Sequence, residues 1–538
     1  MAEQWSVPPG MTGDPMLVRV GASAAGGEDF ACSAREAARA RPAVRPWVRP
    51  RWARREIFVL EPIMSALDRV EFHNVSVERA LSALGRGGGS LHPGLVSYAQ
   101  NAVRCYPFSA GPDGTRLVAD RHFSVVREER GSQVRELYAW GRRYQSQDGR
   151  LREHRFLRFG RAGERERDPA QVALAAFTTA CGDGGAWPTP WDTPFLTFRR
   201  APAERVRVAE VGLADGSYQV LFDGSRAEAE AYYARYGRPR VEEILVGDVA
   251  RPGAACVDCK LLTACSHPPR LPGLLGLTAR PAPLRKVSAS DLRYYQTCPA
   301  QAYLYSLRLP RVNEYGEAAH LGKAVHAWLE DLHRRPDGPP CRVSDLPLID
   351  EDWAAGEWRL AEDAARAGAR MLRQHLEICP LLFQETIGEV RVEPDLAFYD
   401  TAANAIVLAK PDLLYLDDGS WVWRETKTTQ RTWSRDANWI GRYPQLALAI
   451  VLLARGALGG DPGGSRVELE ILHPEDRDIV LLEPDDPETL ALARRTLAEL
   501  AEPWRADEVF APRPGANCRT CPVSVWCPQR AKADEGVE

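Results

Sequence analysis

Residues 410–427, Lys-Pro-Asp-Leu-Leu-Tyr-Leu-Asp-Asp-Gly-Ser-Trp-Val-Trp-Arg-Glu-Thr-Lys, decide the fold prediction for the second half of this 538-residue chain. The stretch reads as a strand, a tight turn at Asp418-Gly419 and a second strand. Residues at positions i and i+2 of a strand point to the same face, so Glu425 and Lys427 project together. Asp412, on the preceding strand, can reach the same place across the hairpin. We therefore expect two carboxylates and one lysine to share a site.

Two converging carboxylates provide hard oxygen ligands that suit Mg²⁺ or Mn²⁺. A metal at such a site lowers the pKa of a bound water and neutralises charge on a phosphodiester. Lys427 can orient that water or stabilise the developing charge. An isolated D…ExK triplet is common, however, and by itself more often marks an exposed hairpin with a salt bridge. The surrounding sequence has to decide between the two.

The flanking sequence supplies that context. Upstream, Leu321-Gly322 is followed by His326, which lies beside a helical stripe of apolar residues between Leu321 and Leu332. Downstream, Tyr443 opens an amphipathic helix that extends to Leu453. Strand-like and helical segments alternate, which predicts an α/β fold with a small central sheet. The expected helices lie within 320–382 and 443–453, and the expected strands at 387–392, 405–416 and 421–426.

In this order the elements resemble the RecB-type nuclease family of the PD-(D/E)XK type, which also includes CRISPR adaptation nucleases and the AddB type. The resemblance covers roughly residues 287–530 and implies a restriction-endonuclease-like fold, a central mixed sheet flanked by helices. It also implies that His326, Asp412 and Glu425 bind the metal. By the same resemblance Lys427 is catalytic, and Gln445 opens the helix that follows the hairpin.

Twelve cysteines, in a chain that we expect to be cytoplasmic, suggest metal sites more than disulfides. Near the C-terminus, Cys518, Cys521 and Cys527 form a C-x2-C-x5-C pattern, and Cys298-Pro299 is similar to the motif that precedes the core in iron–sulfur members of the family. The resemblance implies that these four cysteines hold a 4Fe–4S cluster, which would close a loop of more than 200 residues. A four-cysteine zinc site is the alternative. Four further cysteines stand alone and are interpreted as ordinary thiols or core fillers: Cys32, Cys181, Cys341 and Cys379.

A repeat links the two halves of the chain. Arg251-Pro-Gly-Ala precedes Cys256, Cys259 and Cys265 with the same spacing that Arg513-Pro-Gly-Ala shows before the C-terminal triplet. The order of other pieces is preserved too, because Glu153-His154-Arg155 follows an Asp-Gly turn and precedes a Gln-Val-Ala-Leu-Ala segment at 171–175. Cys105, followed by Tyr-Pro, would take the place of Cys298 and complete a second cluster.

These agreements predict a degenerate N-terminal copy of the same fold. The copy lacks an equivalent of the His326 helix, offers no clear counterpart of Asp412 and has Arg155 where the lysine would be. We expect it to be structural or to guide DNA, with Arg155 available to contact phosphate. The alternative is that only the cysteine knuckle is duplicated. The predicted domains are a flexible Arg/Pro/Gly-rich arm (1–55), the degenerate accessory domain (56–270), a linker (271–286) and the nuclease domain (287–538).

Composition adds bounds on location and partners. We find no secretory signal, and the longest apolar run is far too short to span a bilayer, so we expect a cytoplasmic protein without a membrane partner. The net charge of −4 does not by itself indicate nucleic-acid binding. Such binding would rely on local basic patches and bound cations.

The sequence therefore predicts a DNA nuclease that uses Mg²⁺ or Mn²⁺, an exonuclease acting on single-stranded or end-containing DNA in repair, recombination or defence against foreign DNA. The chain has no Walker-type phosphate loop, since Gly85–Ser90 lacks the lysine. A helicase, or a CRISPR or repair protein, would be a separate partner. The alternative function is a non-catalytic DNA-binding scaffold built from vestigial nuclease domains.

Overall fold

The structure is a computed structural model that describes residues 5–26, 32–48, 58–84, 91–109, 111, 114–311, 316–335, 340–382, 387–434 and 438–530. Contacts divide the chain into two compact units. Unit 1 comprises Met1–His267, Tyr303–Arg311 and Pro514–Glu538, and unit 2 comprises Pro268–Ala302 and Val312–Arg513. Each unit combines mixed sheets with helices, so the predicted α/β class is confirmed. Within the described residues, no helix has the length and apolar character needed to cross a bilayer.

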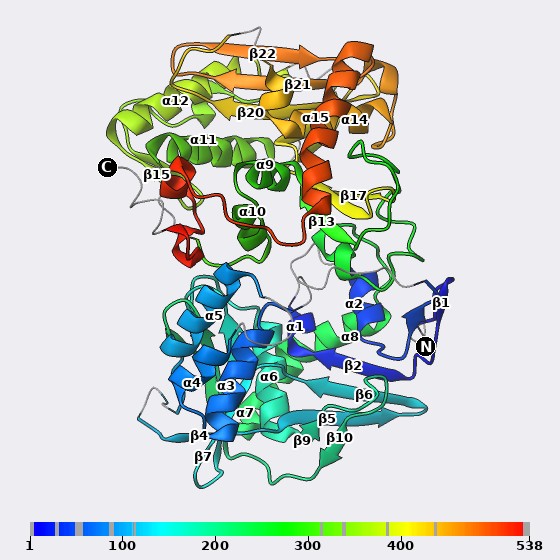
Figure 1. Ribbon diagram of the computed structural model, residues 1–538, viewed down its shortest axis with the longest axis vertical. Coiled ribbons are helices and arrows are strands. Elements are labelled where there is room, and N and C mark those ends of the chain that lie inside the picture. The colour runs from blue at the N-terminus through cyan, green and yellow to red at the C-terminus, as the bar shows by residue number, and fades with distance from the viewer. Residues whose placement is uncertain are drawn as a thin grey trace. The chain divides into compact units, whose positions relative to one another are not determined.

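The central sheet of unit 2 has the strand order β16-β19-β20-β21-β22 (Figure 1). Strands β16, β19 and β20 are antiparallel neighbours, β21 is parallel to β20, and β22 is antiparallel to β21. A parallel pair needs a crossover, and α14 (Pro444–Ala454) provides it. The strands are β16 (Ile387–Val392), β19 (Leu413–Asp417), β20 (Ser420–Thr428), β21 (Arg466–Leu472) and β22 (Arg477–Leu482).

The predicted strand 405–416 is in fact two strands in different sheets. Residues Ala405–Ala409 form β18, which pairs with β13 (Arg285–Ser288) and β17 (Leu396–Asp400), whereas β19 starts at Leu413. Pro411 lies between them, and proline has no N–H with which to continue a ladder. The break places Asp412 immediately before β19.

Helices cover the central sheet of unit 2. Strands β20 and β21 contact α14, and they also contact α11 (Glu317–His333) and α12 (Glu362–Leu376), respectively. Strands covered on both faces are buried along their length, as the consecutive residues Val467 and Glu468 of β21 are. Helix α11 approaches β20 through Gly322, where a Cβ atom would lie 2.8 Å from Thr428 Oγ1. The glycine of the Leu-Gly-x-x-x-His pattern thus permits the close approach of α11 to β20.

Unit 1 contains a sheet of the same design. Its order is β12-β11-β8-β7-β4, in which only the β8–β11 pair is parallel, and α6 (Pro169–Cys181) makes the crossover. Position by position, these strands follow the order and directions of β22-β21-β20-β19-β16. The strands are β4 (Leu117–Ala119), β7 (Arg142–Ser146), β8 (Leu151–Arg158), β11 (Arg205–Gly212) and β12 (Tyr218–Ser225).

The segment predicted to be a flexible arm is part of unit 1 wherever the structure describes it. Strand β2 (Leu17–Gly21) pairs in parallel with β6 (Gln133–Tyr138) in a second five-stranded sheet. Val18 and Val20 are buried in the core, and Arg19 forms a buried ion pair with Glu136 at 2.9 Å. The many small residues that suggested an arm instead pack closely, as the fully buried alanines 22, 25, 37 and 38 show. Residues 1–4, 27–31 and 49–57 lie outside the described residues.

The segment predicted to be a linker packs on unit 2. Leu274 and Leu275 are buried, and both carboxylate oxygens of Asp400 accept backbone N–H groups, from Gly273 and Leu275, at 2.8 Å. Proline and glycine at 268–283 therefore turn a packed segment of unit 2, which begins at Pro268. Ser288 caps α9 (Ala289–Thr297) with Asp291 in a capping box.

Candidate active site

The structure brings together the three residues of the D…ExK pattern. Glu425 and Lys427 lie two residues apart on β20, and the pairing of Leu413 with Arg424 places Asp412 opposite Glu425. Lys427 Nζ lies 3.3 Å from Glu425 Oε2 and 3.8 Å from Asp412 Oδ2. The predicted convergence across the hairpin is therefore present, and it arises because the Asp418-Gly419 turn fixes the register of the two strands.

His326 joins this group from α11. Its Nδ1 atom lies 3.5 Å from Asp412 Oδ1, while Asp412 Oδ2 accepts the backbone N–H of Thr426 at 2.7 Å. The backbone bond fixes the carboxylate so that its other oxygen faces the imidazole. On the neighbouring position of β20, Glu425 Oε1 accepts the indole N–H of Trp423 at 3.0 Å. Both carboxylates are thus held by a neutral donor and keep one oxygen directed at the cationic partners.

Burial and mutual attraction set the charge states. Glu425 is nearly buried, and burial raises the pKa of its carboxyl group, with the negative charge of Asp412 acting in the same direction. Burial would also raise the pKa of Asp412, but His326 and Lys427 hold it below its ordinary value. Burial opposes the charge on His326 and Lys427, yet the carboxylates raise the pKa of both. The charges on Asp412, His326 and Lys427 therefore stabilise one another, whereas burial works against the charge on Glu425.

This donor set suits a divalent cation. Two carboxylates and one imidazole offer hard oxygen ligands and one nitrogen ligand, which are suited to Mg²⁺ or Mn²⁺ rather than to a soft metal. The side chains of His326 and Asp412 are 27% and 25% exposed, so an ion can reach the oxygen that faces the imidazole. The recess beside them is lined by Leu329 of α11, by Arg424 and Thr426 of β20, and by Glu393, which follows β16.

Gln445 occupies the second position of α14 and is partly buried. Tyr443 is the N-cap residue of α14, and the centre of its ring lies 5.8 Å from Lys427 Nζ. The start of α14 therefore lies next to the lysine, and the N–H groups in the first turn of a helix have no partner within the helix and favour anions. Gln445 therefore lies at the start of the helix that follows the hairpin, and its role in catalysis stays a prediction.

Comparison with protein families adds an independent finding. Residues 286–528 match the model of the PD-(D/E)XK nuclease superfamily. We call this stretch the PD-(D/E)XK region; it begins in β13, contains the whole D…ExK constellation and ends just after Cys527. The match indicates a nuclease and confirms the superfamily part of the resemblance, while the RecB-type assignment stays a prediction. A search of curated proteins found no match to the chain.

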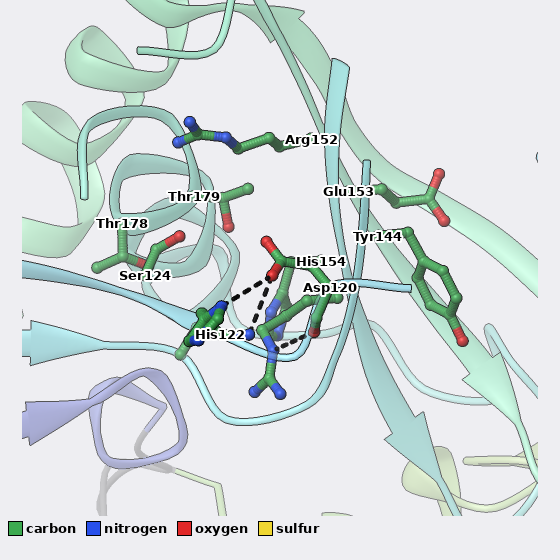
Figure 2. A pocket seen from close by; sticks show the side chains of 11 residues that line it. Asp120, His122, Ser124, Tyr144, Arg152, Glu153, His154, Thr178 and Thr179 are labelled. Carbon is green, nitrogen blue, oxygen red and sulfur yellow. Dashed lines mark hydrogen bonds and ion pairs between the residues drawn. The ribbon is translucent and has the colours of Figure 1, made fainter. Parts of the chain in front are cut away.

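In unit 1, the residues that correspond to the ExK pattern are locked in buried ion pairs. Arg155 Nε lies 2.5 Å from Glu153 Oε1, and Arg207 binds the other oxygen of Glu153 at 3.2 Å. All three side chains are at most 1% exposed. Figure 2 shows Glu153 and Tyr144 pointing away from His154, as alternation along β8 requires. The prediction that Arg155 can contact phosphate is wrong, because its guanidinium is buried and occupied by a carboxylate and backbone oxygens.

The two cysteine knuckles have the same local structure. In each, the glycine of Arg-Pro-Gly-Ala donates its N–H to the first cysteine Sγ at 3.4 Å, Gly253 to Cys256 and Gly515 to Cys518. A 3₁₀ turn follows in both, at Ala254–Asp258 and Ala516–Thr520. Such N–H···S bonds lower the energy of a thiolate, the form that binds metals. Cys298 belongs to unit 2, whereas Cys518, Cys521 and Cys527 belong to unit 1, so their joint cluster stays a prediction.

The N-terminal triplet has a cysteine neighbour that the sequence analysis did not select. Cys32 precedes α2 (Ser33–Arg39), and this helix contacts the knuckle through an Arg35–Asp258 ion pair of 2.9 Å. Cys32 also contributes to the electrostatic environment of Cys256 and Cys259. Cys105, by contrast, ends α5 (Pro93–Cys105) beside Asn101 and the β11–β12 turn at Gly216. Helix α2, which Cys32 precedes, therefore contacts this knuckle, whereas Cys105 lies at the end of α5 beside the β11–β12 turn.

A second group was missed by the sequence analysis. Cys341 and Cys379 were interpreted as isolated thiols, which is wrong, because they lie together with His333 and His375 in a group that could hold a metal ion. The only local signal is the short spacing from His375 to Cys379 around the end of α12. His333 and Cys341 are brought to the same place by tertiary packing.

Proposed function

We propose that the PD-(D/E)XK region cleaves phosphodiester bonds of DNA with the help of Mg²⁺ or Mn²⁺. The convergence of Asp412, Glu425 and Lys427 with His326 carries this proposal. Asp412, Glu425 and His326 would hold the cation. When bound, such a cation lowers the pKa of a water molecule and neutralises charge on the phosphate.

The protein's own residues prepare this reaction. The Thr426 N–H and the Trp423 indole fix the two carboxylates before any substrate arrives, which removes the cost of reorganising them. Lys427 stays protonated between the carboxylates, so its ammonium group can donate hydrogen bonds to an attacking water or to a phosphoryl oxygen. Burial of Glu425 keeps competing water away from one side of the site.

The substrate and setting extend the proposal beyond the superfamily. The RecB-type resemblance supports single-stranded or end-containing DNA as substrate, exonucleolytic cleavage, and work in repair, recombination or defence against foreign DNA. It also supports a separate helicase, or a CRISPR or repair protein, as partner. A non-catalytic DNA-binding scaffold is the competing function, and the intact constellation of two carboxylates and a lysine argues against it.

A cleavage assay separates these functions. Full-length protein, purified without oxygen, is incubated with labelled linear duplex, closed circular and single-stranded DNA in Mn²⁺, Mg²⁺ or excess chelator. We expect loss of label from linear and single-stranded DNA in either metal and no product in chelator, because the charge of the phosphate is then not neutralised. Equal cleavage of circles would contradict the need for ends. DNA binding without cleavage in every metal would favour the scaffold.

For unit 1 we propose a degenerate copy of the nuclease fold that acts as a structural companion. The support is the common strand order, the common position of the crossover helix and the repeated cysteine knuckle. Its Glu153 is neutralised by two arginines, which leaves no open carboxylate for a cation at the ExK position.

For the cysteines we propose a 4Fe–4S cluster on Cys298 and the C-terminal triplet, with zinc as the alternative metal. We also propose a second metal centre on the N-terminal triplet, completed by Cys32.

Anaerobically purified protein should be brown, and Cys521→Ser should lower its iron content by about four atoms per chain. Cys32→Ser should remove the second centre, whereas Cys105→Ser, the matched control, should keep both. Iron and zinc analysis of the three variants checks this. A Cys105→Ser variant that loses metal while Cys32→Ser keeps it would reverse the ligand assignment.

A further inference from the structure

Four metal-ligand side chains meet in the interior of unit 2 at the ends of two helices. His333 is the last residue of α11, and His375 lies in the last turn of α12. One cysteine follows each helix, Cys341 after α11 and Cys379 after α12. One nitrogen or sulfur atom from each residue lies within 4.8 Å of those from the other three.

The separations approach those of a tetrahedral metal site. His333 Nε2 lies 3.2 Å from His375 Nε2, and the two sulfur atoms are 3.2 Å apart. The sulfur–nitrogen separations are 3.8 Å for Cys379 with His333 and 3.9 Å for Cys341 with His375. Zinc bonds of about 2.0 Å to nitrogen and about 2.3 Å to sulfur give tetrahedral edges of about 3.3–3.8 Å. The sulfur atoms are also much farther apart than the roughly 2.05 Å of a disulfide.

All four side chains of this cluster are buried, and a bound cation would compensate for the loss of their contacts with water. Cys379 and His375 are completely buried, Cys341 is 4% exposed and His333 is 8% exposed. Glu470 Oε1 lies 2.6 Å from His375 Nδ1, which places a proton on Nδ1 and leaves the Nε2 lone pair directed at the centre of the group. A single central cation would satisfy this lone pair, the second imidazole and both sulfur atoms at once.

We propose that His333, Cys341, His375 and Cys379 bind one Zn²⁺ in a closed, structural site. Two sulfur and two nitrogen ligands favour zinc over Mg²⁺ or Mn²⁺, and four protein ligands leave no open position for catalysis. The site is distinct from the D…ExK constellation in its residues and in its donor chemistry. It stands whether or not the PD-(D/E)XK region cleaves DNA.

The zinc site supports the candidate active site through Glu470. Its second oxygen, Oε2, accepts the Thr426 hydroxyl at 2.9 Å, and Thr426 is the residue between Glu425 and Lys427. Helix α11 also connects the zinc site to the candidate active site. His326 and His333 are seven residues apart, about two turns, and therefore lie on the same side of this helix. Zinc at this point ties α11 and α12 to β20 and β21. Glu470 is thus a positioning residue that orients a zinc ligand and the strand of the ExK pattern.

Metal analysis of the full-length chain tests the proposal. We expect Cys379→Ser to contain one zinc atom per chain less than the wild type, because a buried four-ligand site loses most of its affinity with one ligand. Cys181→Ser, which changes a lone half-buried thiol in unit 1, should keep the wild-type zinc content. Equal zinc in Cys379→Ser and wild type, or a Cys341–Cys379 disulfide in non-reduced peptide maps, would overturn the proposal.

A measurement on wild-type protein covers the case in which Cys379→Ser fails to fold. Cys341 and Cys379 should resist alkylation in the native protein and become alkylated together when a strong chelator removes one zinc atom. Thiols protected by burial alone would react at the same rate with and without chelator, which would contradict a zinc site.

The role of Glu470 has its own readout. Glu470→Gln keeps an oxygen for the Thr426 hydroxyl but weakens the charge-assisted bond to His375. We expect its zinc affinity, measured by competition with a chromogenic chelator, to fall about 10–100-fold. An unchanged affinity would exclude Glu470 as the residue that orients His375.

Discussion

Asp412→Asn is expected to reduce Mn²⁺-dependent DNA cleavage by about 100-fold or more while leaving the fold intact. The substitution removes the negative charge that faces His326 and pairs with Lys427, at 3.5 and 3.8 Å. The asparagine oxygen can still accept the Thr426 N–H, so the start of β19 keeps its anchor. Rates of product release from labelled DNA, with circular dichroism as a check of folding, measure the effect.

Asp417→Asn is the matched control, because Asp417 ends the strand that Asp412 precedes. Its carboxylate pairs with Arg466 at 2.9 Å and is about as exposed as that of Asp412. This variant should cleave at the wild-type rate and lose at most about 1 kcal/mol of stability. If both variants cleave normally, the D…ExK assignment fails. If both lose activity equally, the loss comes from the hairpin rather than from the metal-binding carboxylate.

Arg155→Ala is expected to destabilise unit 1 by about 3–5 kcal/mol, the usual cost of breaking a buried ion pair. The substitution leaves the buried Glu153 with Arg207 alone and removes the donor to the Phe108 carbonyl. It also removes a guanidinium that lies 4.0 Å from the centre of the Tyr144 ring. Urea unfolding followed by tryptophan fluorescence measures the change.

Arg150→Ala is the control on the same hairpin, since Arg150 and its partner Glu204 are 69% and 67% exposed and 3.6 Å apart. It should change stability by less than about 1 kcal/mol. Under conditions in which Arg155→Ala remains folded, it should cleave DNA at the wild-type rate, because the proposed active site lies in unit 2. A wild-type unfolding midpoint for Arg155→Ala would show that the buried pair adds no net stability.

The hairpin illustrates how far sequence patterns reach. An Asp-Gly turn between two short strands is a local feature, so β7–β8 and β19–β20 could be predicted with their turns. The contact between the N-terminal knuckle and α2, which Cys32 precedes, could not, because nothing local in the sequence distinguishes Cys32 from Cys105. The predicted arm failed for a related reason, since a segment rich in alanine and glycine reads the same whether it is solvated or packed against β6.

The sequence by itself determined the α/β class, the D…ExK hairpin with His326 on a preceding helix, and the repeated cysteine knuckle, because each depends on spacing within a short segment. Only the tertiary structure decided that Arg155 is buried, and that His333, Cys341, His375 and Cys379 meet at one point. Whether a charged side chain is solvated, or distant ligands share a centre, depends on which helix packs on which strand. That packing is determined by the whole core, so no local sequence pattern predicts it.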